Sequence, residues 1–345
     1  MVHKKRDVAA IALTAFVLVC LAGQAMVYVD NPYRCDVSVE RSGQAVVVTI
    51  DTNYSLGYTA ASLVTESMRE VESYAVWYDE AYPVQGDRDA ILVGIDHLRL
   101  SFENNHSELS AIDTAGLAGI MESRDTSVAV VFITGTLPDT VYTGSDDDPI
   151  FGWLEAGGAM YWINGKIGRT SASADGALTA VHDADVLFFG SDSVVNPSAA
   201  DTYTRNISEG SLTDVMGIYY GETTNGVDCS RLTSDHLALD CDDGRYSAVT
   251  FVRYHGGTGT IGAFGGHLKY EAVPTSVMAS VAQAAVSRLS YDTVLIDHAE
   301  GSGSAEVWLE CGRDGAYVFV YFGEMNTVWG ACMPVPSADG AIART

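Results

Sequence analysis

Lysine is nearly missing from this chain. Among 345 residues, 19 are basic and 45 are acidic, which gives a net charge of −26. The only lysines are Lys4, Lys5, Lys166 and Lys269. A surface this acidic repels nucleic acid phosphates and anionic lipid headgroups. We therefore expect no nucleic acid partner.

Metal and cofactor motifs are missing as well. The six cysteines include no C-x-x-C pair of the kind that zinc modules use. The adjacent acids Asp146, Asp147 and Asp148 lack the spaced ligands of a calcium loop, and Asp148 is better explained as a helix cap. Residues 257–262 (GTGTIG) match G-x-G-x-x-G by letter. A strand-like run follows them instead of the helix that a dinucleotide site needs, so we interpret them as a hairpin. The sequence predicts no metal and no cofactor.

Charge is absent from residues 8–29 (VAAIALTAFVLVCLAGQAMVYV). At about 1.5 Å per residue, this run is long enough for a hydrocarbon core of about 30 Å. The basic residues Lys4, Lys5 and Arg6 precede it and favour a cytoplasmic N-terminus. We predict a cytoplasmic basic tail at 1–7, a transmembrane anchor at 8–29 and an extracytoplasmic remainder after Asp30. The alternative is a cleaved signal peptide and a secreted protein.

Export would permit disulfides. The sequence-near pairs Cys229 with Cys241 and Cys311 with Cys332 are the predicted bridges, which leaves Cys35 unpaired. Export would also allow N-glycosylation of three sequons. These are at Asn53, Asn105 and Asn206.

The centre of the chain indicates the fold class. Residues 128–134 (VAVVFIT) are apolar without alternation, which is typical of a strand covered on both faces in a parallel sheet. Asp148 and Pro149 then mark a helix start, and Gly157 with Gly158 marks its end. Residues 159–163 (AMYWI) re-enter the sheet. This succession predicts an α/β fold with a doubly wound, mostly parallel sheet.

The flanking segments predict further elements around this centre. Residues 30–73 predict a membrane-proximal β element with a hairpin around Gly43, and residues 291–345 predict a C-terminal antiparallel β module. Residues 74–290 form the predicted α/β domain. Further strands are expected at 74–78, 90–95, 186–189, 247–254, 261–264, 292–296, 305–309, 316–322 and 328–333. Helices are expected at 110–123 and 273–289, with a helical turn at 177–181.

Two stretches carry a resemblance to a known family. Residues 132–144 (FITGTLPDTVYTG) and 146–165 (DDDPIFGWLEAGGAMYWING) resemble the glutamine amidotransferase-like group of flavodoxin-like folds, including its trehalose-utilisation-protein-like branch. The glycine-rich residues 262–266 and the helix after them also fit. The resemblance implies a flavodoxin-like fold for residues 74–290.

The family's catalytic residue has no counterpart in this chain. Catalytic members carry a cysteine on a tight strand-to-helix elbow, where the helix N-terminus lowers the thiol pKa. Here the candidate elbows at 163–166 (INGK) and 189–192 (FGSD) contain no cysteine. We therefore expect no glutaminase activity.

Ligands of doubly wound sheets bind beyond the carboxyl ends of the strands. Lys166 follows a buried strand and could hold an anionic group, or it could be a solvated charge paired with the surrounding acids. Ser191 lacks the second glycine of a nucleophile elbow, so it and Asp192 are better explained as turn residues. The candidate ligand-binding residues are Asp96, His97, Thr136, Asp139, Asn164, Lys166, Ser191 and Asp192.

Two functional hypotheses follow. The first is a membrane-anchored extracytoplasmic protein whose amidotransferase-like domain is not catalytic and has a binding or structural role in the cell envelope. The second is an envelope hydrolase or carbohydrate-active enzyme that uses carboxylates and histidines at the carboxyl edge of the sheet. Either way, the expected partners are the membrane, through residues 8–29, and a small-molecule or carbohydrate ligand.

Overall fold

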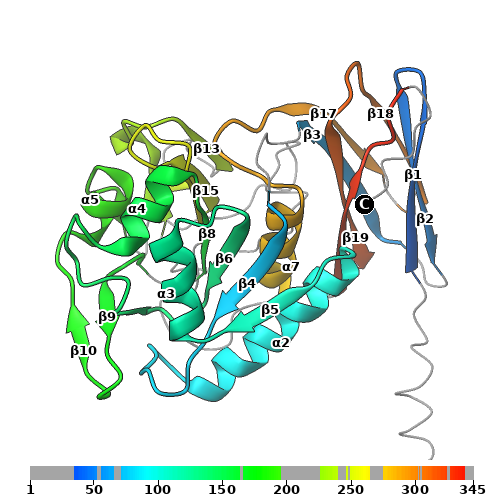
Figure 1. Cartoon of the computed structure of the whole chain (residues 1–345). Helices are drawn as coiled ribbons and strands as arrows, with labels where there is room; N and C mark the ends of the chain where they lie inside the picture. The colour runs from blue at the N-terminus through cyan, green and yellow to red at the C-terminus, as the bar shows by residue number, and fades with distance from the viewer. Residues whose placement is uncertain are drawn as a thin grey trace, which may run out of the picture.

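The computed structural model describes residues 35–52, 56–65, 71–163, 166–195, 226–239, 246–247, 249–264, 275–301, 303, 305–324 and 327–338. Its architecture is mixed α/β (Figure 1). One part contains a large, mostly parallel sheet with helices on its two faces, and we call it the α/β part. The other part consists of antiparallel strands from the two ends of the chain, and we call it the β module.

The seven-strand sheet of the α/β part has the order β13-β15-β16-β8-β6-β4-β5. The strands from β16 to β5 are parallel, whereas β15 is antiparallel to β16 and β13 is antiparallel to β15. Counted in chain order, the parallel strands lie in the order 2-1-3-4-5, so the order reverses between β4 and β6. The strands are β4 (Ser73–Trp77), β5 (Leu109–Ile112), β6 (Val128–Phe132), β8 (Ala159–Ile163), β13 (His236–Leu239), β15 (Val249–Arg253) and β16 (Thr260–Phe264).

Two hydrophobic cores cover the two faces of this sheet. Alternate residues of β6 point to opposite sides, so Val131 joins one core, while Val130 and Phe132 join the other. The first core contains α2 (Arg88–Asn104) and α7 (Thr275–Val286). The second contains α3 (Thr114–Ser123), α4 (Pro149–Ala156) and α5 (Ala184–Phe189). Burial on both faces explains why the β6 sequence shows no polar alternation, and the predicted strand there is confirmed.

The β module is built from two antiparallel sheets that share a core. One sheet has the order β17-β3-β19-β20 and the other β1-β2-β18. The predicted N-terminal hairpin is confirmed as β1 and β2, which join through Gly43 at a φ of 64°. The hairpin and the C-terminal strands form one module, because β18 pairs with β2 and β19 pairs with β3. The strands are β1 (Cys35–Ser42), β2 (Ala45–Thr52), β3 (Tyr58–Thr65), β17 (Leu295–Gly301), β18 (Glu306–Glu310), β19 (Ala316–Glu324) and β20 (Thr327–Pro334).

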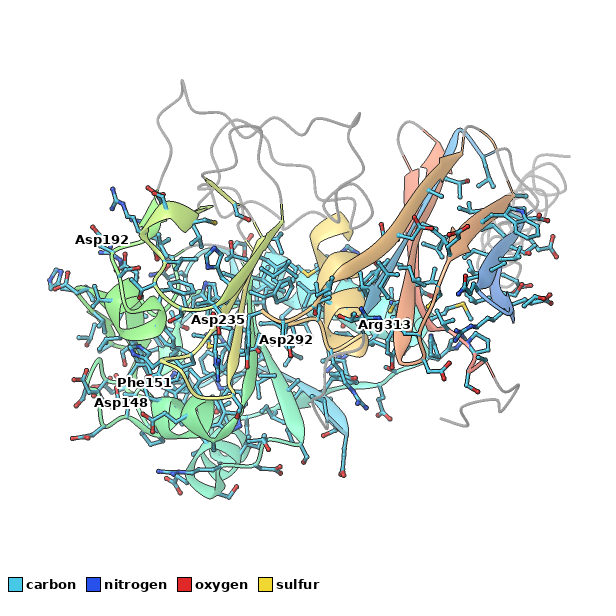
Figure 2. The ribbon with its side chains drawn as sticks, turned by 90° about the horizontal axis from the view of Figure 1, so that it is seen from above. Asp148, Phe151, Asp192, Asp235, Asp292 and Arg313 are labelled. Carbon is cyan, nitrogen blue, oxygen red and sulfur yellow. The ribbon has the colours of Figure 1, made fainter. Side chains whose placement is uncertain are left out.

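The β module packs against the α2 and α7 side of the α/β part. Phe319 of β19 and Cys332 of β20 belong to the same core as these helices. Asn105, the residue after α2, joins the two parts, since its Oδ1 accepts a hydrogen bond from Cys332 N at 2.7 Å and its Nδ2 donates to Ser101 O at 2.7 Å. Figure 2 shows the two parts from above, with Asp192 on the side of the α/β part and Arg313 on the side of the β module.

Smaller ribbons complete the α/β part. One three-strand ribbon has the order β10-β9-β7, and another has the order β11-β12-β14. Their bounds are β7 (Leu137–Pro138), β9 (Thr170–Ala172), β10 (Leu178–Ala180), β11 (Val194–Val195), β12 (Gly226–Asp228) and β14 (Tyr246–Ser247), and a 3-10 turn, η1, covers Cys229–Arg231.

Residues 90–95, predicted as a strand, belong to helix α2. The helix begins after Asp87, whose carboxylate accepts a hydrogen bond from Asp89 N at 3.0 Å. The apolar run at 90–95 is only the first part of a longer pattern with helical spacing. The buried residues of this period are Ile91, Ile95, Leu98 and Phe102.

Three other predicted elements also differ. Residues 186–189, predicted as a buried strand, lie in helix α5, and residues 177–181, predicted as a helical turn, contain strand β10. The helix predicted at 110–123 begins at Thr114, since β5 occupies the residues before it. In the first two cases a window of four or five residues was too short to distinguish a strand from a helix.

Asp148 plays a different part from the predicted one. Helix α4 begins at Pro149 and ends at Gly157, which has a φ of 119°, so the predicted start and end are confirmed. The Asp148 carboxylate, however, makes no hydrogen bond to the helix. It accepts instead from the preceding loop, from Thr143 N at 2.7 Å, Thr143 Oγ1 at 2.8 Å, Gly144 N at 2.8 Å and Ser145 N at 2.9 Å.

The predicted span at residues 8–29 lies outside the described residues. In the part of the chain that the structure describes, no helix has the length and apolar character needed to cross a membrane. The sequons at Asn53 and Asn206 also lie outside it. Asn105 is buried and its amide group is hydrogen-bonded, so this sequon has no room for a glycan.

Candidate functional site

The strand order reverses between β4 and β6, and a ligand crevice is expected beyond the carboxyl ends of these two strands. The chain itself fills much of this place. Thr134 and Thr136, which follow β6, are fully buried. Thr136 Oγ1 donates to Pro83 O at 3.2 Å, and Gln85 N donates to Thr134 O at 2.9 Å. The loop before α2 therefore crosses over the end of β6.

Gln85 fixes this closure from two sides. Its side-chain amide donates to Thr170 Oγ1 of β9, which joins the loop to the next ribbon. Gly135 has a φ of 71°, and a Cβ there would lie 3.0 Å from Gln85 Cβ. Glycine is required at this point because a side chain would meet Gln85 in a backbone conformation that disfavours it.

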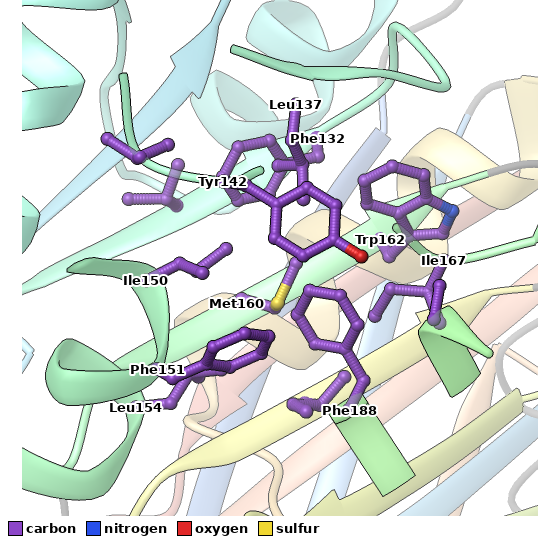
Figure 3. Close-up of a cluster of buried hydrophobic side chains, with 14 of the residues drawn as sticks. Phe132, Leu137, Tyr142, Ile150, Phe151, Leu154, Met160, Trp162, Ile167 and Phe188 are labelled. Atoms are coloured by element: carbon purple, nitrogen blue, oxygen red, sulfur yellow. The ribbon is translucent and has the colours of Figure 1, made fainter. Parts of the chain in front are cut away.

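Aromatic and aliphatic side chains close the same edge on the α4 side of the sheet. Figure 3 shows Tyr142 and Leu137 gathered with Phe132 of β6 and Trp162 of β8. Tyr142 and Trp162 are buried, and their Oη and Nε1 atoms have no hydrogen-bond partner among the described residues. This side of the crevice is hydrophobic core rather than an open pocket.

A polar group remains at the end of β4. We call Asp79, Tyr82, Thr114 and Asp139 the Asp79 cluster. The Asp79 carboxylate accepts hydrogen bonds from Ala81 N at 3.0 Å and from Thr114 N at 3.1 Å. Thr114 is the first residue of α3, so Asp79 satisfies a backbone N–H that has no partner inside the helix.

The charges of this cluster are fixed by its surroundings. Burial opposes the charge of Asp79, but the hydrogen bonds from Ala81 and Thr114 outweigh it and lower the pKa of Asp79. Burial, followed by the negative charge of Asp139, raises the pKa of Tyr82. Asp79 is therefore ionised and Tyr82 neutral near pH 7. The cluster can accept and donate hydrogen bonds, but neither group has the near-neutral pKa that suits proton transfer.

The predicted site residues do not converge on one place. Thr136 is at the expected edge but buried, Asp139 is exposed beside Tyr82, and Lys166 is half-buried after β8. Asn164 lies outside the described residues. Asp96 and His97 are in the middle of α2, where Asp96 forms an exposed ion pair with Arg99 at 3.4 Å, so they are not at a strand end.

Ser191 and Asp192 lie away from the carboxyl edge. They follow helix α5, and Asp192 is tied to Arg231, whose Nη1 donates to Asp192 O at 2.7 Å. Residues 229–235 precede β13, which runs in the same direction as β16. These residues, and Asp192 with them, therefore lie at the amino end of the sheet.

Part of the site was missed by the sequence prediction. Tyr82, Gln85 and Thr170 come from loops and a short ribbon, and the sequence gives no signal that brings them together. Asp79 had such a signal, since it follows a recognised strand.

The predicted glycine-rich hairpin is confirmed, because residues 254–259 join antiparallel β15 and β16. A Cβ on Gly259 would lie 2.0 Å from Leu154 O, so close backbone packing explains this glycine.

The described cysteines lie far from this edge. Cys229 is in η1, where burial raises its pKa to about 11. Burial also raises the pKa of Cys332. Cys311 belongs to the core between the two β-module sheets, whereas Cys332 faces α2 and α7. Cys229, Cys311 and Cys332 are free, so the predicted Cys311–Cys332 disulfide is absent, and Cys241 lies outside the described residues.

No group of three histidine, cysteine or acidic side chains is placed to hold a metal ion within the described ranges. Comparison of the chain with family models, curated proteins and solved structures found no match.

Proposed function

We propose that this chain is a non-catalytic binding protein, presented outside the cytoplasmic membrane, with a glutamine amidotransferase-like α/β domain as its scaffold. The parallel strand order 2-1-3-4-5, which is that of flavodoxin-like folds, supports this assignment. The expected location rests on the uncharged residues 8–29 and the basic residues before them. The expected ligand is a small molecule or carbohydrate held by hydrogen bonds at the Asp79 cluster.

The positions of the cysteine thiols support the proposal that the protein is not catalytic. Glutamine hydrolysis in the resembling family needs a thiolate at a strand-to-helix elbow. The turns after β4, β6 and β8 contain no cysteine. Cys229 and Cys332 have raised pKa values, so they are protonated thiols near pH 7.

A glutaminase assay tests this. The purified full-length protein should release no ammonia from glutamine beyond a heat-denatured sample. Ammonia release that disappears after thiol alkylation and in Cys229→Ala would overturn the proposal, because the nucleophile would then be present at another place.

A carboxylate-based hydrolase is the second candidate. The observation in its favour is that Asp79 and Asp139 both act on Tyr82 through their charge. The lowered pKa of Asp79 argues against it, since a general acid must hold a proton near the working pH. A thermal-shift screen of oligosaccharides separates the two. A hit recovered intact, and lost in Asp79→Asn, supports binding, whereas a hit that is cleaved supports the hydrolase.

A further inference from the structure

Helix α5 buries an acid in its first turn. The side chain of Asp185 is only 3 % exposed, and Phe188 of the same helix belongs to the second core of the α/β part. A carboxylate in such a place keeps its charge only if hydrogen-bond donors or a cation compensate the loss of water. The groups that face Asp185 therefore decide whether it holds a proton.

These groups offer the carboxylate little. Arg169 Nη2 lies 3.9 Å from Asp185 Oδ1, which is too far for a hydrogen bond. Asp185 Oδ2 and Arg169 Nε are buried, and neither has a hydrogen-bond partner among the described residues. The nearby Tyr142 hydroxyl supplies no donor either, since its Oη atom is also buried without a partner there. As a carboxylate, Asp185 would leave one buried oxygen unsatisfied.

A second acid provides the missing partner. The carboxyl group of Asp192, on the loop after α5, lies within hydrogen-bonding reach of Asp185. Two carboxylates are both acceptors, so they can bond to each other only when one of them holds a proton. Burial, followed by this hydrogen bond, raises the pKa of Asp185, and the positive charge of Arg169 opposes the rise only in part. Asp185 takes the proton because its burial penalises the charged form.

Asp192 links this pair to a later part of the chain. Its side chain is exposed, and Arg231 Nη1 donates to Asp192 O at 2.7 Å and lies 3.6 Å from Asp192 Oδ2. Arg231 Nε lies 3.2 Å from Oδ2 of Asp228, the last residue of β12. The pair thus connects α5, through Arg231, to η1 and β12. The other ionisable residues next to α5 are His182, Asp183, Tyr254 and His255.

We propose that Asp185 and Asp192 share one proton and form a latch that holds α5 to the loop after it in acid and releases it as the pH rises. The latched state binds this proton more tightly than the open state does. Its contribution is therefore fully present below the ordinary carboxyl pKa of about 4 and is lost as the pH rises through the raised folded value. Once Asp185 is ionised, the two carboxylates repel each other, and the exposed Asp192 can turn to solvent.

The latch acts on conformation rather than on chemistry. Asp185 is buried, so it does not reach a substrate and is not a catalytic acid. The inference is independent of whether the Asp79 cluster binds or hydrolyses a ligand.

Hydrogen exchange of the full-length protein, measured by mass spectrometry between about pH 4 and about pH 8, tests the latch. The reference is Asp185→Asn, whose amide keeps the shape of the acid and can donate to Asp192 at every pH. The protection of residues 184–193, divided by that of this variant, should fall by up to about tenfold per pH unit above about pH 4 and then level off. The matched control is Asp183→Asn, since this exposed side chain makes no capping bond to α5, and it should keep the wild-type pH dependence.

A carbon-13 NMR titration of labelled aspartate carboxyl groups tests the shared proton directly. The midpoint of Asp185 should lie above about 4 in the wild-type protein. It should move down in Asp192→Asn, because the new amide can donate to ionised Asp185 and the neighbouring negative charge is gone.

Each other outcome overturns the proposal. A protection ratio that does not change with pH would mean that the proton on Asp185 does not hold this segment. Loss of the pH dependence in Asp183→Asn would mean that the charge of the region, and not this pair, is measured. A midpoint of Asp185 that is unchanged in Asp192→Asn would mean that burial alone sets it. The NMR titration of the wild-type protein needs no variant to fold, and a midpoint at the ordinary value of about 4 would remove the latch.

Discussion

The carboxyl edge of the seven-strand sheet and strand β18 of the β module place their tryptophans in opposite environments. At the edge, where a ligand crevice is expected, Trp162 is 1 % exposed and belongs to the same core as Tyr142 and Leu137. On the outer side of β18, Trp308 is 61 % exposed. The first region uses its aromatic residues for the core, and the second leaves one uncovered.

This difference bears on how much each tryptophan contributes to stability. A buried indole contributes a large free energy of burial, whereas an exposed one contributes little to folding and adds apolar surface to water. The Trp308 side chain therefore contributes less to the free energy of folding than a buried tryptophan of the same size. The carboxyl edge differs, because the chain itself buries the aromatic side chains there.

The largest expected effect comes from truncating the two tryptophans in turn. Trp162→Ala should lower the free energy of unfolding by about 3–5 kcal/mol, because a large buried side chain leaves a cavity. Trp308→Ala should change it by less than about 0.5 kcal/mol. Urea unfolding followed by far-UV circular dichroism measures both. Equal losses would break the comparison, since Trp308 would then be a packing residue.

A second, smaller effect tests how the loop at the edge is held. Asp148→Asn keeps the shape of the side chain but removes the charge that accepts hydrogen bonds from Thr143, Gly144 and Ser145. Stability should fall by about 2 kcal/mol. The neighbouring Asp147→Asn, at an exposed position, is the matched control and should change little. Similar values for the two variants would show that general charge, rather than these bonds, is measured.

The sequence predicted the centre of the fold well. Residues 128–134 and 159–163 are continuous apolar runs, and the two strands are buried on both faces as this pattern implies. The helix between them was recognised from Pro149 and Gly157, since each has a backbone requirement that is local in the sequence. Local signals of this kind can be recognised without knowledge of the rest of the molecule.

The site was predicted poorly because it depends on contacts between distant segments. Asp96 and His97 were placed at a strand end only because residues 90–95 were taken as a strand, whereas the helical period extends to Phe102. The burial of Thr136 follows from its contact with Pro83, which no local pattern reveals.

The exposed position of Trp308 was beyond sequence reasoning for a related reason. The run at Glu306–Glu310 alternates, and its strand was expected. Which side of the strand faces the core is set by its pairing with β2, more than 250 residues earlier in the chain. The exposure of Trp308 is therefore a property of the assembled module.

The smallest expected effect concerns the Asp79 cluster, the polar group that remains at the carboxyl edge of the sheet. The pKa of Asp79 is lowered in the folded protein, so its contribution to stability is fully present above the unfolded pKa of about 4 and is lost as the pH falls through the folded value. Asp79→Asn removes this contribution. The difference in unfolding free energy between the wild-type protein and the variant should be constant above about pH 5 and should shrink below about pH 4. Chemical unfolding across this pH range measures it. A difference that stays constant down to the acid end would mean that the backbone bonds from Ala81 and Thr114 do not depend on the charge of Asp79.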